Sequence, residues 1–441
     1  MRVLDRVFRL SENGTSVRTE VLAGFTSFLT MAYIIVVNPA ILADAGMPFA
    51  GAAAATCIGA AIGSIMIGLA ANTPIALAPG MGLNAYFTYT VVNGMGLPWE
   101  TALGCVFLSG LAMLLLTVAG LRQLIIAAIP QSLYAAIAAG IGLFIAFIGL
   151  HGAGIVVANP VTAVALGDLR APSAGLAVFG LALTAALLVW KVRAAILAGI
   201  LATTALAWVL GEVTVKPVEY GVAALTSTAF KLDIPAALGL GGQGTGIALI
   251  EIVFIFLFVD LFDNLGTLVA VTQRAGLMTP DGRIPRLRRM LFADSAASMA
   301  GAIAGTSPVV NYIESASGVS AGGRTGLTAV VVGLLFLAAL FAAPYAQAIP
   351  AAATAPALVL VGAMMMAPLA RVDWHDPAAS IPAFLILVGI PLTFSISNGI
   401  AFGVIAHVVL KGAAARLGRE DWLMILLAGL FAARFAWLAA A

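Results

Sequence analysis

Long apolar runs recur along the whole sequence, and each is close to the length that crosses a bilayer as a helix. A helix needs roughly 20 residues to cross a hydrocarbon layer about 30 Å thick. Only 9% of the 441 residues are charged, whereas soluble domains carry roughly 25%. Such a chain cannot cover itself with polar groups in water, and a β-barrel would show short alternating segments instead. The sequence therefore predicts an all-α polytopic membrane protein.

The apolar runs form two sets of seven, with a longer connection between them. The first set is predicted at 22–38, 51–70, 79–93, 101–120, 131–149, 174–191 and 193–211. The second set is predicted at 245–272, 289–304, 314–322, 324–344, 355–370, 376–393 and 396–411. A last apolar stretch, 420–438, belongs to neither set. We expect it to lie along the cytoplasmic face as a helix, with Arg434 reaching the lipid headgroups.

Basic residues indicate how the chain is oriented. They gather at the N-terminus and in the segment 274–289, which follows the eighth run. By the positive-inside rule these segments are cytoplasmic, so the N-terminus is expected inside the cell. Seven spans in each half place the halves in inverted orientation. The Ala-rich composition suits a bacterium, so the inner membrane is the expected location.

Two segments at corresponding places in the halves support such a repeat. Asn72-Thr73-Pro74 leads into Pro79-Gly80, and Thr306-Ser307-Pro308 leads into Tyr312-Ile313-Glu314-Ser315. We expect 73–79 and 307–313 to be extended and to cross near the middle of the membrane. Each then enters a short half-helix, in the third and tenth spans. In inverted repeats, interrupted helices at matching positions indicate the binding site of a secondary transporter. Their N-termini favour acceptor atoms or anionic groups.

Ionisable residues inside spans are costly, so each one is a site candidate. Asp260 and Asp263 lie on one face of the eighth span, and Glu314 lies at the predicted start of the tenth-span half-helix. Each has a structural alternative: Asp260 or Asp263 could be held by neighbouring backbone or lie near a helix end, and Glu314 could cap its helix. Asp294 lies near a span end, and we interpret it as structural, whereas Arg324 is expected to mark the cytoplasmic end of its helix.

Polar and aromatic residues near these acids suit a flat heterocycle. The amide of Asn84 offers a donor and an acceptor, although a hydrogen bond between helices would explain it equally well. Four aromatic residues could stack on a ring or could simply pack between helices: Phe28, Tyr33, Phe87 and Phe262.

Other functions find little support in the sequence. Two acidic residues would repel an anion, which disfavours an anion transporter of the same architecture. No span carries the polar stripe of a channel, and no nucleophile–base or metal-ligand set indicates a membrane enzyme. There is no Walker A motif, and His151, His375 and His407 lack metal-site spacing. The net charge of +2 is too small to indicate a nucleic-acid partner.

The same segments resemble one family, the azaguanine-type adenine/guanine/hypoxanthine permeases of the nucleobase–ascorbate transporters. The matching stretches include Ala-Pro-Gly-Met-Gly-Leu-Asn-Ala-Tyr-Phe at 78–87 and Phe-Val-Asp-Leu-Phe-Asp-Asn-Leu-Gly-Thr-Leu at 258–268. The others are Thr15–Glu20, Gly24–Tyr33, Asn38–Pro39, Ala138–Leu150, Tyr312–Ser315 and Gly322–Val330. They occur in family order over nearly the whole chain, so the resemblance is specific.

The resemblance implies fourteen spans in two inverted seven-span repeats that form a core domain and a gate domain. The core comprises 1–120 (spans 1–4) and 244–345 (spans 8–11), and the gate comprises 121–211 (spans 5–7) and 346–411 (spans 12–14). An extracytoplasmic connection at 212–243 and a C-terminal helix at 412–441 complete the expected organisation. Relatives also suggest a homodimer formed through the gate domain.

The resemblance further implies a purine nucleobase importer, not an enzyme, that works by proton symport with an elevator-type movement of the core. The family's substrate carboxylates match Asp263 and Glu314, and its functional Asn matches Asn84. The expected substrate site also includes Thr30, Phe262 and Tyr312, and proton coupling is assigned to Asp263, Glu314 or Asp260. The proton is the coupling ion, and no cofactor or metal is expected. Three residues depart from the family pattern near the site: Asn264, Pro308 and Asn311.

Overall fold

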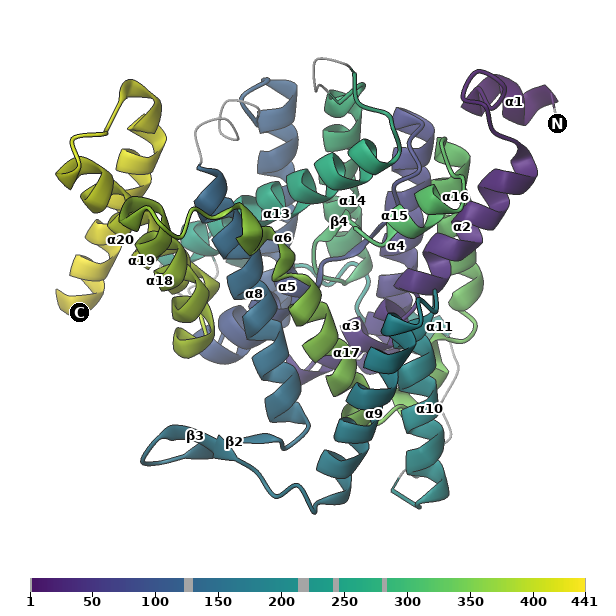
Figure 1. Ribbon diagram of the computed structural model, residues 1–441, viewed down its shortest axis with the longest axis horizontal. Coiled ribbons are helices and arrows are strands. Elements are labelled where there is room, and N and C mark those ends of the chain that lie inside the picture. Colours follow the sequence, from purple (N-terminus) through teal and green to yellow (C-terminus); the bar gives the residue numbers. More distant parts are fainter. Residues whose placement is uncertain (1, 123–129, 213–221, 241–245, 280–283, 441) are drawn as a thin grey trace. The chain divides into compact units, whose positions relative to one another are not determined.

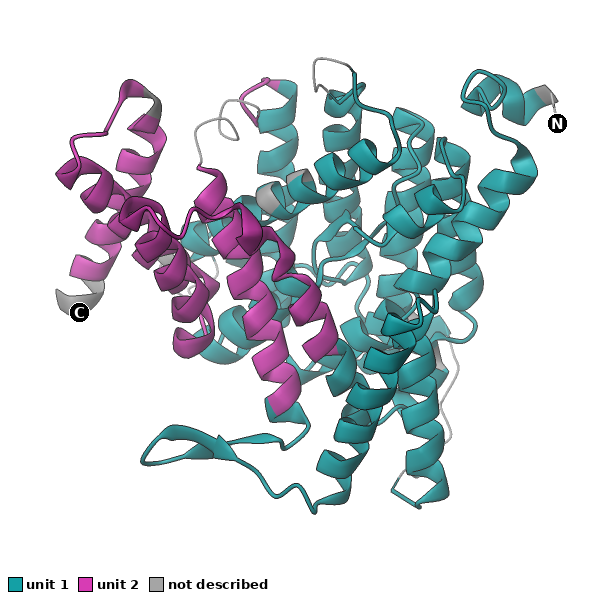
Figure 2. Cartoon of the chain, viewed as in Figure 1, with its two compact units in different colours: residues 1–118, 151–357 teal, residues 119–150, 358–441 magenta. Residues whose placement is uncertain are grey.

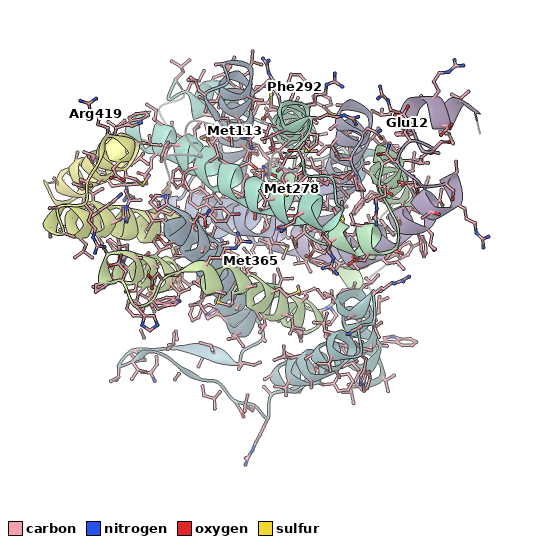
Figure 3. All side chains as sticks on the ribbon, turned by 45° about the horizontal axis from the view of Figure 1, so that its top comes forward. Glu12, Met113, Met278, Phe292, Met365 and Arg419 are labelled. Atoms are coloured by element: carbon pink, nitrogen blue, oxygen red, sulfur yellow. The ribbon has the colours of Figure 1, made fainter. Side chains whose placement is uncertain are left out.

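The protein is mostly helical, as the sequence predicts. The structure, a computed structural model, describes residues 2–122, 130–212, 222–240, 246–279 and 284–440 (Figure 1). Within these residues, eight helical stretches are long and apolar enough to cross a membrane. Apolar side chains also face outward, as Phe292 does on its helix with 47% of its surface exposed (Figure 3). This distribution is that of a polytopic membrane protein.

The chain divides into two compact units (Figure 2). Unit 1 combines Met1–Val118 with His151–Ala357, and unit 2 combines Ala119–Leu150 with Leu358–Ala441. All the described site candidates lie in unit 1. The core and gate boundaries expected from the family stay a prediction.

Unit 1 contains most of the helices. In its first part these are α1 (Arg2–Phe8), α2 (Val17–Met31), α3 (Ile34–Asp44), α4 (Phe49–Ala71), α5 (Met81–Ala85), the π-helix η1 (Tyr86–Gly94) and α6 (Trp99–Val118). They are followed by α9 (Pro172–Val189), α10 (Ala195–Val209), α11 (Val222–Leu225) and α12 (Ile234–Ala237). The last are α13 (Gly246–Arg274), α14 (Leu287–Ala304), α15 (Ser315–Ser320), α16 (Gly326–Ala339) and the 3-10 helix η2 (Ala343–Ala348). A hairpin of β2 (Val156–Asn159) and β3 (Ala163–Leu166) projects from these helices (Figure 1).

Both predicted extended segments contain strands, and the strands pair with each other. β1 (Leu77–Pro79) lies antiparallel to β4 (Val309–Asn311), with Pro79 opposite Val309. Two further backbone bonds extend this ladder, from Gly80 N–H to Pro308 O (2.9 Å) and from Tyr312 N–H to Ala76 O (3.0 Å). β1 then leads into α5 and β4 into α15, so the expectation of extended segments that feed short helices is confirmed.

Helices α4 and α14 enclose the strand pair. On α4, the Ser64 hydroxyl donates to the carbonyl oxygen of Leu77 and accepts from its N–H group. On α14, the Ser298 hydroxyl donates to the Val309 carbonyl oxygen at 2.9 Å. Glycines allow the close approach: a Cβ on Gly301 would lie 2.6 Å from the Val309 side chain. Backbone groups inside a membrane protein need such partners because hydrocarbon offers none. Helices α4 and α14, which directly precede the two extended segments and are rich in Gly, Ala and Ser, therefore supply partners for the backbone of the paired strands.

A buried carboxylate joins α2 to the start of α16. Glu20 is fully buried and accepts from the backbone N–H groups of Arg324, Thr325 and Thr328, and from the Thr328 hydroxyl. The Arg324 N–H precedes α16, and those of Thr325 and Thr328 lie at its N-cap and in its first turn, where N–H groups lack the usual helical acceptor four residues earlier. Glu20 thus caps α16 from a different helix. The Arg324 guanidinium group donates separately to the carbonyl oxygens of Val319 and Gly323. Its expected place at the cytoplasmic end of the helix stays a prediction.

Unit 2 ends in a hairpin of two helices. It contains most of α8 (Gln131–Gly152) and the end of α17 (Ala351–Met364), followed by η3 (Ala367–Arg371), α18 (Pro377–Thr393), α19 (Ile396–Ala413), η4 (Arg419–Asp421) and α20 (Trp422–Ala440). At the turn, Lys411 binds both oxygens of Asp421 at 2.7 and 2.8 Å. At the other end, Arg434 donates to the Asn398 side chain at 2.9 Å. α20 therefore runs antiparallel along α19 for about 20 Å. Arg434, expected at the lipid headgroups, is held within this hairpin.

Candidate functional site

Glu314 lies between the end of β4 and the start of α15. It occupies the N-cap position of that helix, but its side chain makes no capping hydrogen bond. Its carboxylate instead accepts a 2.8 Å hydrogen bond from the hydroxyl group of Tyr33. The capping alternative is therefore wrong, and the carboxylate is turned toward other side chains.

Two tyrosines surround this carboxylate. Tyr33 lies at the interruption between α2 and α3, is 1% exposed, and interacts electrostatically with Glu314 and Tyr312. The hydroxyl group of Tyr312 donates to the carbonyl oxygen of Pro79 at 2.6 Å. Tyr312 thus links β1 to the segment that carries Glu314, and Tyr33 orients the acid itself.

Asp263 approaches the same place from α13. It lies close enough to interact electrostatically with Glu314 and Asp294. Within the described part of the chain, no side-chain hydrogen bond joins its carboxylate to a partner. Like charges at close range repel strongly where the dielectric constant is low. Bringing Asp263 and Glu314 together therefore favours a proton or a hydrogen-bond donor between them.

Asp260 belongs to a separate buried network one turn earlier on α13. Asn264 donates from Nδ2 to Asp260 Oδ1 at 2.7 Å and to Asp294 Oδ2 at 2.9 Å. Its Oδ1 accepts from the backbone N–H of Asn311 at 2.8 Å and from Asn311 Nδ2 at 2.7 Å. Asp260 is thus bonded by a neighbouring side chain, whereas the structural alternative expected neighbouring backbone or a position near a helix end. Asp294 is fully buried in the same network, as its structural interpretation implies.

Asn84 takes part in a second amide network. Its Nδ2 donates to Asn38 Oδ1 at 2.7 Å, and Asn38 in turn donates to Thr56 and Thr306 at 2.8 and 2.9 Å. The helix-to-helix alternative therefore accounts for the nitrogen of Asn84. Its oxygen is buried and has no hydrogen-bond partner in the described part of the chain. That oxygen is still able to accept from a ligand.

The remaining candidates divide between the site and ordinary packing. The Thr30 hydroxyl donates to the Ser27 carbonyl oxygen at 2.8 Å and lies 3.5 Å from the Glu314 carbonyl oxygen. Phe28 packs edge-on against Phe336, with ring centroids 5.2 Å apart, and Phe87 is fully buried. The Phe262 side chain lies outside the described residues.

The structure thus brings Tyr33, Asp263, Tyr312 and Glu314 together and places Asn84 in a neighbouring network. Sequence reasoning considered Tyr33 only for stacking and missed its bond to Glu314. It also missed the bonds that join Asn264 to Asn311, although both stood out as departures from the family pattern. Among the described residues, no group of three or more His, Cys, Asp or Glu side chains could hold a metal ion. The arrangement can bind a small molecule with N–H groups.

Comparison with known proteins places the chain among transporters. Residues 18–402 match a family model described as the Permease family (Xan_ur_permease). Adenine permease AdeP of Escherichia coli is 47% identical over 97% of this chain and 95% of its own length. Guanine/hypoxanthine permease PbuO of Bacillus subtilis is 42% identical over 96% of this chain and 98% of its own length. These similarities identify a transporter rather than an enzyme.

Solved structures share the fold at low sequence identity. The transmembrane domain of the cyanobacterial bicarbonate transporter BicA has a TM-score of 0.63 and 17% identity, over 88% of this chain and 97% of that chain. SLC26A9 has a TM-score of 0.65 and 12% identity, over 92% of this chain and 66% of that chain. At such identities the likeness concerns the fold alone. The sequence matches decide the family, and the chain belongs to the Permease family of membrane transporters.

Proposed function

We propose that this protein imports purine nucleobases, namely adenine, guanine or hypoxanthine. One observation carries the proposal: Glu314, oriented by Tyr33, lies next to the paired strands β1 and β4 and within electrostatic range of Asp263. Purines carry ring N–H groups that hydrogen-bond to carboxylates. The names of the relatives, which include adenine and guanine/hypoxanthine permeases, support the same substrate class.

Glu314 receives the purine in this proposal. A charged acceptor makes stronger hydrogen bonds than a neutral one. A carboxylate therefore favours ligands that carry ring N–H donors over ligands that lack them. The unpartnered oxygen of Asn84 is available for a second donor on the ligand. Another small heterocycle with the same donor pattern is the alternative substrate. An anion is disfavoured because both site carboxylates would repel it.

Transport is driven by protons in this proposal. Asp263 is the first candidate for the carrier, because it is an ionisable group inside a membrane span and lies within electrostatic range of Glu314. Glu314 and Asp260 are the alternatives. The two site carboxylates can also titrate as one coupled unit.

The wider organisation of the transporter is proposed on the family pattern. Fourteen spans in two inverted repeats would form a core and a gate, and the core would carry the site across by an elevator-type movement. The N-terminus would face the cytoplasm of a cell whose inner membrane holds the protein. Two copies would associate through the gate.

Substituting Glu314 tests the substrate site. Glu314→Gln keeps the shape of the side chain but replaces the charged acceptor, which costs about 1.5–3 kcal/mol of binding, or at least about tenfold in affinity. The measurement is binding of radiolabelled adenine, guanine and hypoxanthine to the purified protein. Glu12→Gln is the matched control, because Glu12 is an exposed N-terminal residue paired with Arg9. Equal affinity of the Glu314 variant and the wild type would move the ligand away from this residue.

Substituting Asp263 tests proton coupling. We expect Asp263→Asn to bind or exchange purine but to lose accumulation driven by a pH gradient, because Asn cannot take up a proton. Uptake is measured in proteoliposomes with and without an inward proton gradient, for wild type and variant. Gradient-driven accumulation by the variant would assign the proton to Glu314 or Asp260 instead.

A further inference from the structure

Asn264 and Asn311 connect the two acidic residues of the proposed site through a buried amide pair. Asn264 directly follows Asp263 on α13, and Asn311 precedes Glu314 at the end of β4. Both amides are almost fully buried, at 0% and 2% exposure. Two hydrogen bonds join Asn311 to Asn264, and a third joins Asn311 to a further acid, Asp294.

The direction of each amide in this pair is fixed by its partners. A backbone N–H can only donate, so the Asn311 N–H fixes the oxygen of Asn264 on the strand side. The nitrogen of Asn264 must then face the carboxylates of Asp260 and Asp294. The nitrogen of Asn311 lies between two acceptors, Asn264 Oδ1 and Asp294 Oδ1, which fixes its direction as well.

No other common side chain of this size satisfies both sides. Asp at position 264 could accept from the Asn311 N–H but would repel Asp260 and Asp294. Leu would leave the backbone N–H without a partner, which is costly for a buried donor. Thr has one hydroxyl group on a shorter side chain and cannot replace an amide that bonds on two opposite sides. The carboxamide at 264 therefore joins α13 both to α14, through Asp294, and to β4, through Asn311.

We propose that Asn264 and Asn311 form a positioning pair that sets the separation between Asp263 and Glu314. The inference rests on the proposed purine site and adds two positioning residues to it. Neither amide needs to touch the ligand. They hold β4 against α13 so that the Glu314 carboxylate meets the purine at the distance and angle a hydrogen bond requires.

Four variants of the full-length protein test the pair: Asn264→Ala, Asn311→Ala, the double variant and Ser298→Ala. Ser298 is the matched control because its hydroxyl also holds β4, but at Val309, the end farther from Glu314. Radiolabelled adenine, guanine and hypoxanthine binding and thermal unfolding are measured in parallel. We expect Asn264→Ala to weaken binding about tenfold. Asn311→Ala should lose less, because the backbone N–H bond to Asn264 stays.

The double variant distinguishes a pair from two independent residues. We expect it to bind no more weakly than Asn264→Ala alone, because residues that act as one unit are not additive. Ser298→Ala should lower the unfolding temperature and leave the purine Kd within about twofold of wild type.

Three results would overturn the inference: wild-type affinity in Asn264→Ala, losses that multiply in the double variant, or affinity losses that follow the unfolding temperature in every variant, Ser298→Ala included. A wild-type protein that binds none of the three purines would refute the proposed function and this inference with it. Purine binding by the wild type with unaltered amide variants refutes the inference alone.

Discussion

The hydroxyl group of Tyr33 donates a hydrogen bond that orients the Glu314 carboxylate. Tyr33→Phe removes it while keeping the ring, its packing and its buried position. The lost bond is 2.8 Å long and ends on a carboxylate, a type of hydrogen bond that contributes about 1.5–3 kcal/mol. Glu314 is not fully buried, so water will replace part of this contribution. We therefore expect the lower end of the range, about tenfold weaker purine binding.

The assay is equilibrium binding of radiolabelled purines to purified wild type and variants, with unfolding temperature measured alongside. Tyr89→Phe is the matched control, because the Tyr89 hydroxyl also donates to a carboxylate, Asp44 Oδ2, at 2.7 Å. Its removal should leave purine affinity unchanged. The reasoning is refuted if Tyr33→Phe binds purines as tightly as wild type, or if both variants lose affinity equally.

Three further predictions concern stability and are checked by thermal unfolding of the purified protein. Glu20→Gln should lower the stability of the protein by about 2–3 kcal/mol, because the amide nitrogen would face buried N–H donors at the start of α16. An unchanged unfolding temperature would contradict the role of Glu20 as the cap of α16. Gly326→Ala should cost about 1–3 kcal/mol or prevent folding, since its Cβ would meet the Gly68 carbonyl oxygen; wild-type stability would show that the helices can move apart. Burial opposes ionisation of Asp421, but the Gly418 N–H and Lys411 outweigh it and lower its pKa. Its stabilising effect is therefore present above about pH 4 and lost as pH falls through the lowered pKa; an Asp421→Asn variant should show a smaller loss of stability over that acidic range than wild type.

The long helices are predictable from the sequence because each is an apolar run bounded by polar or helix-breaking residues, whereas the short helices α1, α11 and α12 were not predicted. The predicted run 51–70 corresponds to α4 at Phe49–Ala71, and 376–393 to α18 at Pro377–Thr393. The extended segments were predictable for a related reason, since proline and β-branched residues interrupt otherwise helical stretches. These signals are local, and local signals are what a single sequence displays.

Contacts between distant residues left no such signal. The run 22–38 was predicted as one helix, but hydrogen bonding changes at Ala32 and Tyr33, where the sequence has neither Gly nor Pro. That interruption holds the tyrosine that meets Glu314, 281 residues later. The amide pair is equally hidden, because nothing at Asn264 indicates a partner on β4. The acids were predictable from their cost in a membrane, whereas the groups that orient them depend on tertiary structure.

The pairing of β1 with β4 has a consequence for how the protein is made. Val309 follows its partner Pro79 by 230 residues. At a synthesis rate of about 5–20 residues per second, the ribosome needs roughly 10 to 50 s to deliver the second strand after the first. Throughout that interval the newly inserted first half holds an extended segment whose backbone groups have no strand to pair with. Its N–H and C=O groups must be kept solvated, by water or by the insertion machinery, until the second half arrives. The proposed binding site therefore cannot be completed before the second half is made, and a nascent chain released before β4 lacks one strand of the pair.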